Sequence, residues 1–403
     1  MLKKDNFFKN YFKNSTSYNN SLKKTNFFFN SLISDIKKNK IPLLNSYEKN
    51  YDYDFSKSTI KKFSKYKNIV IIGMGGSILG TKSIYSFFES KIKKNVFFFD
   101  NLDFNLNLKY KKIKNLKNTC FIIVSKSGNT LETITNLGII FSKNLLKNKL
   151  VIITEITNNT LVDIANNYNA EIIEHKEFIG GRYSVLSETG MFPSALMGLN
   201  LAKFKSLKSL IKNKNFVSSL IHNVASIFTL SLKNKNNSVL LNYDSSLNNL
   251  GYWYQQLVAE SLGKKGKGIN PNLSFGPKDH HSLLQLYLDG PKDKFFTFFN
   301  STKKEKSFKV FGNIIPENMK LLKNKDLKFI INAQYKATKN IFKSKKIPFR
   351  EISFDKKNED ELGRIFTFFV LETILLSRLM NVNPFDQPAV ERVKIETEKF
   401  LRQ

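Results

Sequence analysis

The stretch NIVIIGMGGSILG, residues 68–80, decides how the first half of the chain folds. Its apolar run Ile69–Ile72 is short, unbroken and closed by Gly73, which is typical of a strand buried on both faces of a sheet. The glycines that follow allow a tight turn, and the residues after them can begin a helix. The stretch therefore predicts a strand, a glycine-rich turn and a helix, which together form the first half of a βαβ unit.

Three similar apolar runs follow at intervals of about 25 to 30 residues, with segments of helical length between them. They are residues 95–100, 120–124 and 150–154. Strands that alternate with helices in this way are typical of a parallel sheet.

A weaker cycle of the same kind occupies the second half of the chain. Its strand-like segments are residues 238–243, 295–299 and 327–331, and its helical segments are 251–262 and 361–380. We therefore expect an α/β fold with two doubly wound domains, each with a mainly parallel sheet flanked by helices. The predicted division is a helical lead-in at 1–48, a first α/β domain at 49–200, a second α/β domain at 201–380 and a C-terminal helix at 381–403.

The chain is strongly basic. Its 403 residues include 65 Lys and Arg against 33 Asp and Glu, a formal net charge of +32. A polyanionic partner is one interpretation. However, only six of the basic residues are arginines, which nucleic-acid readers favour for forked contacts, and the lysines are dispersed. Lys, Asn, Ile and Phe all have AT-rich codons, so base composition accounts for the excess, and we expect no nucleic-acid partner.

The sequence carries no targeting or membrane signal. The first residues lack the apolar run of a signal peptide. The apolar stretch 365–380 contains Glu372 and Arg378 and is shorter than the roughly 20 apolar residues of a bilayer span. The single cysteine, Cys120, excludes an intramolecular disulfide. We expect a cytoplasmic protein without a membrane partner.

The glycine cluster at residues 73–80 has several possible interpretations. A nucleotide P-loop requires Lys before Ser or Thr, whereas Thr81-Lys82 has the reverse order. A dinucleotide fingerprint starting at Gly73 requires a glycine where Ile78 stands, although Asp100 lies where a ribose-binding acid could sit. An anion-binding helix start and a tight turn without a ligand both remain open.

A second loop, residues 125–133, also follows a predicted strand directly. It reads Ser-Lys-Ser-Gly-Asn-Thr-Leu-Glu-Thr, with four hydroxyls and one lysine at a predicted helix start. A single hydroxyl is enough to cap a helix, so the other hydroxyls favour a phosphate site. No Asp-rich metal motif accompanies the loop, which favours a sugar phosphate over a magnesium nucleotide and predicts no metal.

Two further segments carry groups suited to proton transfer. Arg182 lies in the segment Gly180–Ser187, and a guanidinium can stabilise a developing oxyanion or simply form a salt bridge. Gln256 and Glu260 stand four residues apart and therefore share one helix face. A carboxylate among apolar neighbours is a weaker acid than in water and can serve as a base near neutrality, whereas a helix-end glutamate is often only solvated.

The last candidates are a histidine pair and a C-terminal lysine. Asp279 precedes His280 and His281 and could fix a histidine tautomer. Pro388 suits a first helical turn, which would place Lys394 about two turns along that helix.

Taken in order, these segments resemble the phosphoglucose isomerase family, which is built from two sugar-isomerase (SIS) domains. The resemblance spans most of the chain, from about residue 69 to 394. It rests on residues 73–77, 125–130, 180–187, 260–264 and 386–391. The segment Gly-Gly-Arg-Tyr-Ser-Val-Leu-Ser and the Asp-Gln-Pro tail are its most specific parts.

The resemblance implies reversible interconversion of glucose 6-phosphate and fructose 6-phosphate through a cis-enediol, without metal or cofactor. Glu260 matches the family's base, and Arg182 matches the arginine that steadies the enediolate. His281 looks like the ring-opening histidine, and Lys394 looks like the lysine at the ring oxygen. The substrate-binding positions implied in the same way are Gly76, Ser77, Ser125, Lys126, Ser127, Thr130, Gln256 and Gln387.

The family is usually homodimeric, with the histidine supplied by the partner subunit, so the resemblance implies a homodimer. His280 stands where the family often has an apolar residue, and Ser282-Leu283 after His281 favours His281 as the match. Ala389 stands where glycine is common. The alternatives are an isomerase that also accepts mannose 6-phosphate, a non-catalytic SIS sensor of sugar phosphates and a dinucleotide oxidoreductase.

Overall fold

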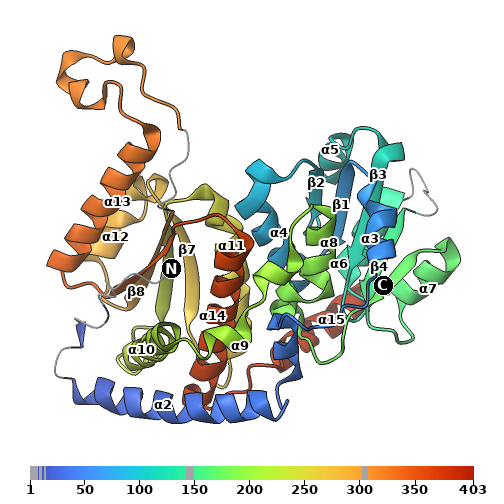
Figure 1. Ribbon diagram of the computed structural model, residues 1–403, viewed down its shortest axis with the longest axis horizontal. Coiled ribbons are helices and arrows are strands. Elements are labelled where there is room, and N and C mark those ends of the chain that lie inside the picture. The colour runs from blue at the N-terminus through green and yellow to red at the C-terminus, as the bar shows by residue number, and fades with distance from the viewer. Residues whose placement is uncertain (1–7, 9–10, 13–14, 142–148, 302–306) are drawn as a thin grey trace.

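The computed structural model describes residues 8, 11–12, 15–141, 149–301 and 307–403. Two separate parallel sheets, with helices around and between them, form the body of the molecule (Figure 1). Within the described residues, no helix is both long enough and apolar enough to cross a membrane.

The first sheet has the strand order β2-β1-β3-β4-β5, and all its pairs are parallel. Its strands are β1 (Asn68–Gly73), β2 (Asn95–Phe99), β3 (Thr119–Val124), β4 (Leu150–Thr154) and β5 (Glu171–Glu174). The four predicted strands are confirmed. The edge strand β5 was not predicted, because it is short and has a glutamate at each end instead of a continuous apolar run.

The second sheet has the order β7-β6-β8-β9, again all parallel. Its strands are β6 (Asn237–Asn242), β7 (Asn270–Phe275), β8 (Lys294–Ser301) and β9 (Phe349–Phe354). The spatial order of these four strands, second-first-third-fourth in sequence, is the same as that of the first four strands of the other sheet. The two halves of the chain therefore share one topology, in line with the predicted α/β class.

The strand expected at residues 327–331 is wrong, because this segment begins helix α13 (Leu327–Ser344). The carboxylate of Asp326 accepts from the backbone amides of Lys328 and Phe329 and caps that helix. A run of five residues fits a strand or a buried helix turn equally well, and here the cap decides.

Strands β7 and β9 were not predicted, because each contains residues that weaken the strand signal. β7 carries Pro271, and β9 carries Arg350 and Glu351. Arg350 is fully buried and bonds Glu372 through both of its terminal nitrogens. The sequence suggests that the charge of Arg350 is exposed to solvent, but the structure shows it paired inside the protein.

The other helices mostly cover the sheets. The α-helices are α2 (Thr16–Lys37), α3 (Lys57–Ser64), α4 (Gly76–Phe88), α5 (Leu106–Lys111), α6 (Leu131–Phe141), α7 (Thr160–Tyr168), α8 (Glu188–Leu196), α9 (Leu207–Leu210), α10 (Lys214–Ser231), α11 (Asn248–Leu262), α12 (Leu284–Asp289), α14 (Glu359–Met380) and α15 (Glu391–Leu401). The 3-10 helices used below are η1 (Pro42–Tyr47), η4 (Gly181–Leu186), η7 (Lys278–His281) and η10 (Pro388–Val390). Helices α11, α14 and α15 agree with the prediction. The predicted lead-in contains α2 and η1, and part of it lies outside the described residues.

One large apolar cluster lies between the two sheets and contains side chains from α4, α8, α10, α11 and α14. Smaller clusters fill the outer faces, under α5, α6 and α7 on the first sheet and under α12 and α13 on the second. α11 packs directly against α4, so a helix of the second sheet reaches the loops of the first (Figure 1).

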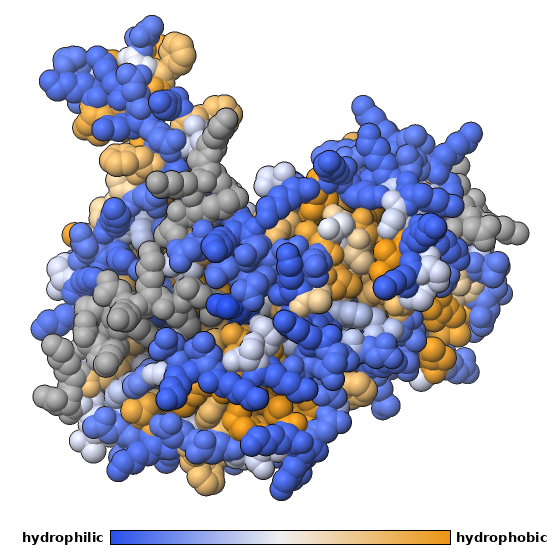
Figure 2. Space-filling view, viewed as in Figure 1, coloured by the Kyte–Doolittle hydropathy of each residue, from blue (hydrophilic) through white to orange (hydrophobic). Residues whose placement is uncertain are grey.

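An arm at residues 307–326 projects from the body beside the second sheet, at the top of Figure 1. It exposes Phe308, Phe311 and Ile314. Figure 2 shows a mostly hydrophilic face, with orange side chains on the arm and in patches on the body.

Candidate active site

The glycine loop and the hydroxyl loop lie side by side, because β1 and β3 are neighbouring parallel strands. After β1 the chain continues to β2 on one side of the pair, and after β3 it continues to β4 on the other side. Such a point in a doubly wound sheet leaves a crevice at the carboxyl ends of the strands, where ligands bind.

Glycine is required at 75 by its left-handed backbone and at 76 by close packing against another part of the backbone. Gly75 has φ +51°, and a Cβ there would lie 2.9 Å from Nε2 of Gln256. A Cβ on Gly76 would lie 2.2 Å from the carbonyl carbon of Gly181. The loop is therefore pressed against both η4 and α11, and Ser77 lies in the first turn of α4 beside them.

The hydroxyl loop turns sharply at Gly128, where φ is +68° and a Cβ would lie 1.9 Å from Oδ1 of Asn159. The Oγ of Ser125 lies 2.7 Å from Oγ1 of Thr130, which holds the two ends of the loop together. Ser125 is buried, whereas Ser127 is exposed. The loop thus offers hydroxyls at several depths beside the start of α6.

The ammonium group of Lys126 already has protein partners. It donates to the carbonyl oxygen of Glu177 at 2.7 Å and lies 3.3 Å from the carboxylate of Glu155. This side chain joins the hydroxyl loop to the segments that follow β4 and β5.

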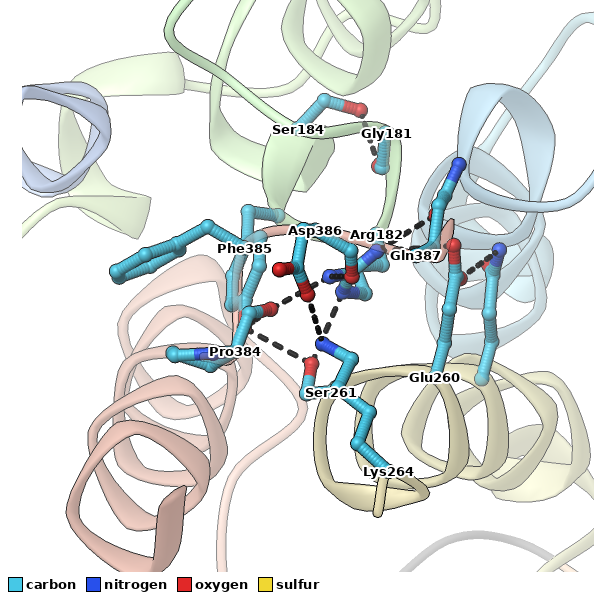
Figure 3. Close-up of polar contacts among 12 residues, drawn as sticks. Gly181, Arg182, Ser184, Glu260, Ser261, Lys264, Pro384, Phe385, Asp386 and Gln387 are labelled. Atoms are coloured by element: carbon cyan, nitrogen blue, oxygen red, sulfur yellow. Dashed lines mark hydrogen bonds and ion pairs between the residues drawn. The ribbon is translucent and has the colours of Figure 1, made fainter. Parts of the chain in front are cut away.

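Arg182 is the centre of the polar network in Figure 3. It is only 3% exposed, and its Nη1 lies 2.9 Å from Oε1 of Glu260 and 2.8 Å from Oε1 of Gln387. Its Nη2 donates to the carbonyl oxygens of Pro384 at 2.5 Å and Asp386 at 3.0 Å. Its Nε donates to Oγ of Ser261 at 2.9 Å, so every polar edge of the guanidinium is engaged, which fixes its plane.

Glu260 lies on α11 with 22% of its side chain exposed. One carboxylate oxygen meets Arg182, and the other accepts from Nε2 of Gln256 at 2.9 Å. The expected apolar surroundings of this carboxylate are wrong, since its oxygens are bound by a cation and an amide. The pairing on one helix face is as predicted.

The segment 383–387 crosses this network as a strap, and sequence reasoning missed what fastens it. Lys264 lies one turn after Glu260 and pairs with Asp386 at 2.8 Å, and it also donates to the carbonyl of Asn383. The hydrogen bond from Lys264 holds the pKa of the Asp386 carboxyl below its usual range. The sequence did contain a signal for this contact, because Lys264 ends the motif at residues 260–264 that begins with Glu260.

The histidine pair lies on η7, and its two members differ. His280 is bound, with Nε2 2.6 Å from Oη of Tyr243, and burial lowers its pKa. His281 is exposed. The carboxylate of Asp279 accepts from Ser274, Phe275 and Ser282, so the expectation that it orients a histidine is not what the hydrogen bonds show.

Lys394 lies on α15, 61% exposed, and pairs with Glu391 at 2.8 Å. Within the described part of the chain, no hydrogen bond or ion pair links Lys394 or His281 to Glu260 or Arg182. These two predicted catalytic residues are therefore separate from the cluster.

Comparison with known proteins shows the family of the chain. The sequence profile of phosphoglucose isomerase matches residues 52–402. The glucose-6-phosphate isomerase of Methanocaldococcus jannaschii is 34% identical over 87% of this chain and 88% of its own length. The glucose-6-phosphate isomerase of Campylobacter jejuni is 30% identical over 83% of this chain and 85% of its own length.

The chain belongs to the phosphoglucose isomerase family.

Solved structures agree in fold with this member of the phosphoglucose isomerase family. A hypothetical protein from Thermus thermophilus superposes with a TM-score of 0.80 over 100% of both chains, at 22% identity. A glucose-6-phosphate isomerase from Chlamydia trachomatis superposes with a TM-score of 0.72 over 85% of this chain and 71% of its own length, at 18% identity.

The predicted residues of this phosphoglucose isomerase family member thus fall into two sets. One set gathers where the loops of the first sheet meet α11 and the strap: Gly76, Ser77, Ser125, Lys126, Ser127, Thr130, Arg182, Gln256, Glu260 and Gln387. The other set, His281 and Lys394, lies outside it. Ser261, Tyr183, Lys264 and Asp386 were missed as supports of Arg182 and the strap.

Proposed function

We propose that this protein interconverts glucose 6-phosphate and fructose 6-phosphate through a cis-enediol. The observation that carries the proposal is the contact between Glu260 and Arg182 beside the glycine loop. A carboxylate that can move a proton and a fixed cation that can hold an enediolate oxygen lie within reach of one substrate.

The proton transfer needs only one carboxylate. Glu260 removes the proton from C2 of the open-chain aldose, and the electrons of that bond form the C1–C2 double bond while the C1 carbonyl oxygen becomes negatively charged. The proton of the C2 hydroxyl passes to the C1 oxygen through the cis-enediol. Glu260 then returns its proton to C1, and the C2 oxygen, which has lost its own proton, becomes the ketone. Arg182 stabilises the negative charge on the enediolate oxygen, with its plane fixed before the substrate arrives.

The phosphate is anchored by the two loops at the β1/β3 crevice. The hydroxyls of Ser77, Ser125, Ser127 and Thr130 supply donors, and the first turns of α4 and α6 add their backbone dipoles. Lys126 contributes to this loop mainly by tying it to Glu155.

The two glutamines hold the sugar hydroxyls. Oε1 of Gln256 is buried and has no hydrogen-bond partner among the described residues, and a sugar hydroxyl would satisfy it. Gln387 lies exposed on the strap with its oxygen on Arg182, which leaves its amide nitrogen for the substrate.

Ring opening and the homodimer complete the proposal. The exposed His281 opens the sugar ring in the site of a second subunit, and Lys394 assists at the ring oxygen. His280 is bound to Tyr243 and serves structure instead. The separation of His281 from Glu260 within one chain supports this assignment.

The test is an isomerase assay with purified protein in EDTA, following the conversion of fructose 6-phosphate to glucose 6-phosphate. We expect turnover that EDTA does not reduce, and absence of turnover by folded protein would contradict the proposal. Mannose 6-phosphate, assayed in parallel, distinguishes the bifunctional alternative. Tight binding of sugar phosphate without turnover would favour the sensor instead.

A further inference from the structure

Ser261 directly follows Glu260 on α11 and is fully buried (0% exposed). Its Oγ lies 2.9 Å from Nε of Arg182 and 2.9 Å from Oη of Tyr183 (Figure 3 shows Ser261 beside Arg182). We propose that Ser261 is a positioning residue that fixes the Arg182 guanidinium relative to Glu260. The inference rests on the proposed isomerisation and adds a residue to it.

The direction of each hydrogen bond follows from what each group can do. Nε of Arg182 can only donate, so the oxygen of Ser261 accepts from it. The Pro384 carbonyl can only accept, so Tyr183, whose Oη lies 3.0 Å away, donates there. The Ser261 hydroxyl is then left to donate to Tyr183.

The hydrogen bonds close into a ring, because the Pro384 carbonyl also accepts from Nη2 of Arg182 at 2.5 Å. Each proton in the ring has one acceptor, and Ser261 and Tyr183 are both almost completely buried. The ring therefore holds the Nε edge of the guanidinium and leaves Nη1 directed at Glu260. Without Ser261, the Nε group would be buried and unpaired, which costs free energy and lets the guanidinium turn.

The placement on α11 gives this serine a role that a distant serine could not have. Glu260 and Ser261 are consecutive on one rigid helix, so any movement of that helix carries the carboxylate and the holder of the arginine together. The distance between the base and the cation is thereby preserved. Orientation that is fixed before the substrate binds lowers the barrier without changing ground-state binding.

The test is the Ser261→Ala variant, with steady-state kinetics on fructose 6-phosphate. We expect kcat to fall roughly 10- to 100-fold while KM changes less than about threefold. The second readout is inhibition by a five-carbon aldonate phosphate, whose planar carboxylate imitates the enediolate. Its inhibition constant should rise by about the same factor as kcat falls.

Two further variants and a control separate positioning from stability. Ser261→Thr keeps the hydroxyl and should restore most of kcat, and Tyr183→Phe removes the next link and should lower kcat less than Ser261→Ala does. The control is Ser377→Ala, on α14, where the serine is also 0% exposed but its Oγ donates to Ile374 of its own helix at 2.7 Å. That variant should keep kcat and inhibition unchanged.

A kcat within about twofold of wild type in Ser261→Ala would overturn the proposal, as would a rise in KM that accounts for the whole loss. Equal losses in the Ser377→Ala control would also overturn it. If Ser261→Thr does not fold, Tyr183→Phe decides, and unchanged aldonate inhibition in that variant refutes the ring. If the wild type shows no turnover, the proposed function fails, and aldonate affinity of wild type against Ser261→Ala still tests the positioning role.

Discussion

Nη1 of Arg182 lies 2.9 Å from Oε1 of Glu260, although the two residues belong to different halves of the chain. Arg182 lies on η4, after the last strand of the first sheet, and Glu260 lies on α11, between β6 and β7 of the second. The proposed base and cation meet only because α11 packs against α4 across the apolar cluster between the sheets. The reaction centre is thus a product of packing between the two halves.

Glu260→Gln should abolish most turnover. The amide keeps the shape of the side chain but cannot accept a carbon-bound proton, so we expect kcat to fall about 10²- to 10⁴-fold. Sugar-phosphate binding, measured by calorimetry, should survive, because the loops at Ser77 and Ser125 are untouched. A near-normal rate would refute the assignment of the base.

His281→Ala and His280→Ala should behave differently. His281 is exposed, whereas His280 bonds Tyr243 at 2.6 Å and Thr338 at 3.3 Å. We expect His281→Ala to slow the cyclic substrate more than an open-chain one, with little change in the melting temperature. His280→Ala should chiefly lower the melting temperature. The reverse pattern would move the ring-opening role to His280.

Gly128→Ala should weaken the phosphate loop. A Cβ there would lie 1.9 Å from Asn159, and the φ of +68° is one that alanine rarely adopts. We expect a raised KM for sugar phosphate and a loss of about 1–3 kcal/mol of stability. Gly138→Ala, on α6, is the matched control, because nothing lies within 4 Å of its added Cβ. That helix substitution should be neutral or stabilise by about 0.5–1 kcal/mol, and equal effects at both sites would contradict the argument.

Arg350→Met should be strongly destabilising. Arg350 and Glu372 are 0% and 1% exposed, so removing the cation leaves a buried carboxylate without its partner. We expect a loss of about 3–5 kcal/mol in urea unfolding, and a smaller loss in the double variant Arg350→Met/Glu372→Leu. A double variant that is less stable than the single one would show that the unpaired carboxylate of Glu372 is not the cause of the loss.

Lys205→Met should change how stability depends on pH. Lys205 is 1% exposed, its ammonium lies 4.4 and 4.0 Å from the ring centres of Tyr51 and Tyr53, and burial lowers its pKa from 10.5 to about 7. Between those values the unfolded chain holds a proton that the folded one lacks. Stability therefore rises with pH over this window, by up to about 1.4 kcal/mol per unit.

The measurement is urea unfolding at pH 7, 8 and 9. The advantage of Lys205→Met over wild type should be largest at the lowest pH and shrink as the pH rises. The exposed Lys203→Met is the control and should leave the slope unchanged. A slope in Lys205→Met equal to that of wild type would show that this lysine is not responsible.

The sequence by itself determined the chemistry of the loops and the fold class. Short segments of the sequence are enough to predict strands β1 to β4 and the glycine and hydroxyl loops. The same holds for the pairing of Gln256 with Glu260. An apolar run ended by glycine, or two residues four apart on a helix, are local patterns that need no distant contact to be recognised.

Tertiary structure alone decided the surroundings of Arg182 and the weaker elements. Its partners Ser261 and Pro384 are 79 and 202 residues away in sequence, and no local pattern encodes such contacts. Likewise, β9 can hold Arg350 because Glu372 pairs with it inside the protein. The helix at residues 327–331 is different, because its cap, Asp326, lies directly beside it in the sequence. For Arg182 and Arg350, the deciding interactions join groups whose meeting depends on how the chain packs, since burial sets whether a charge is favourable.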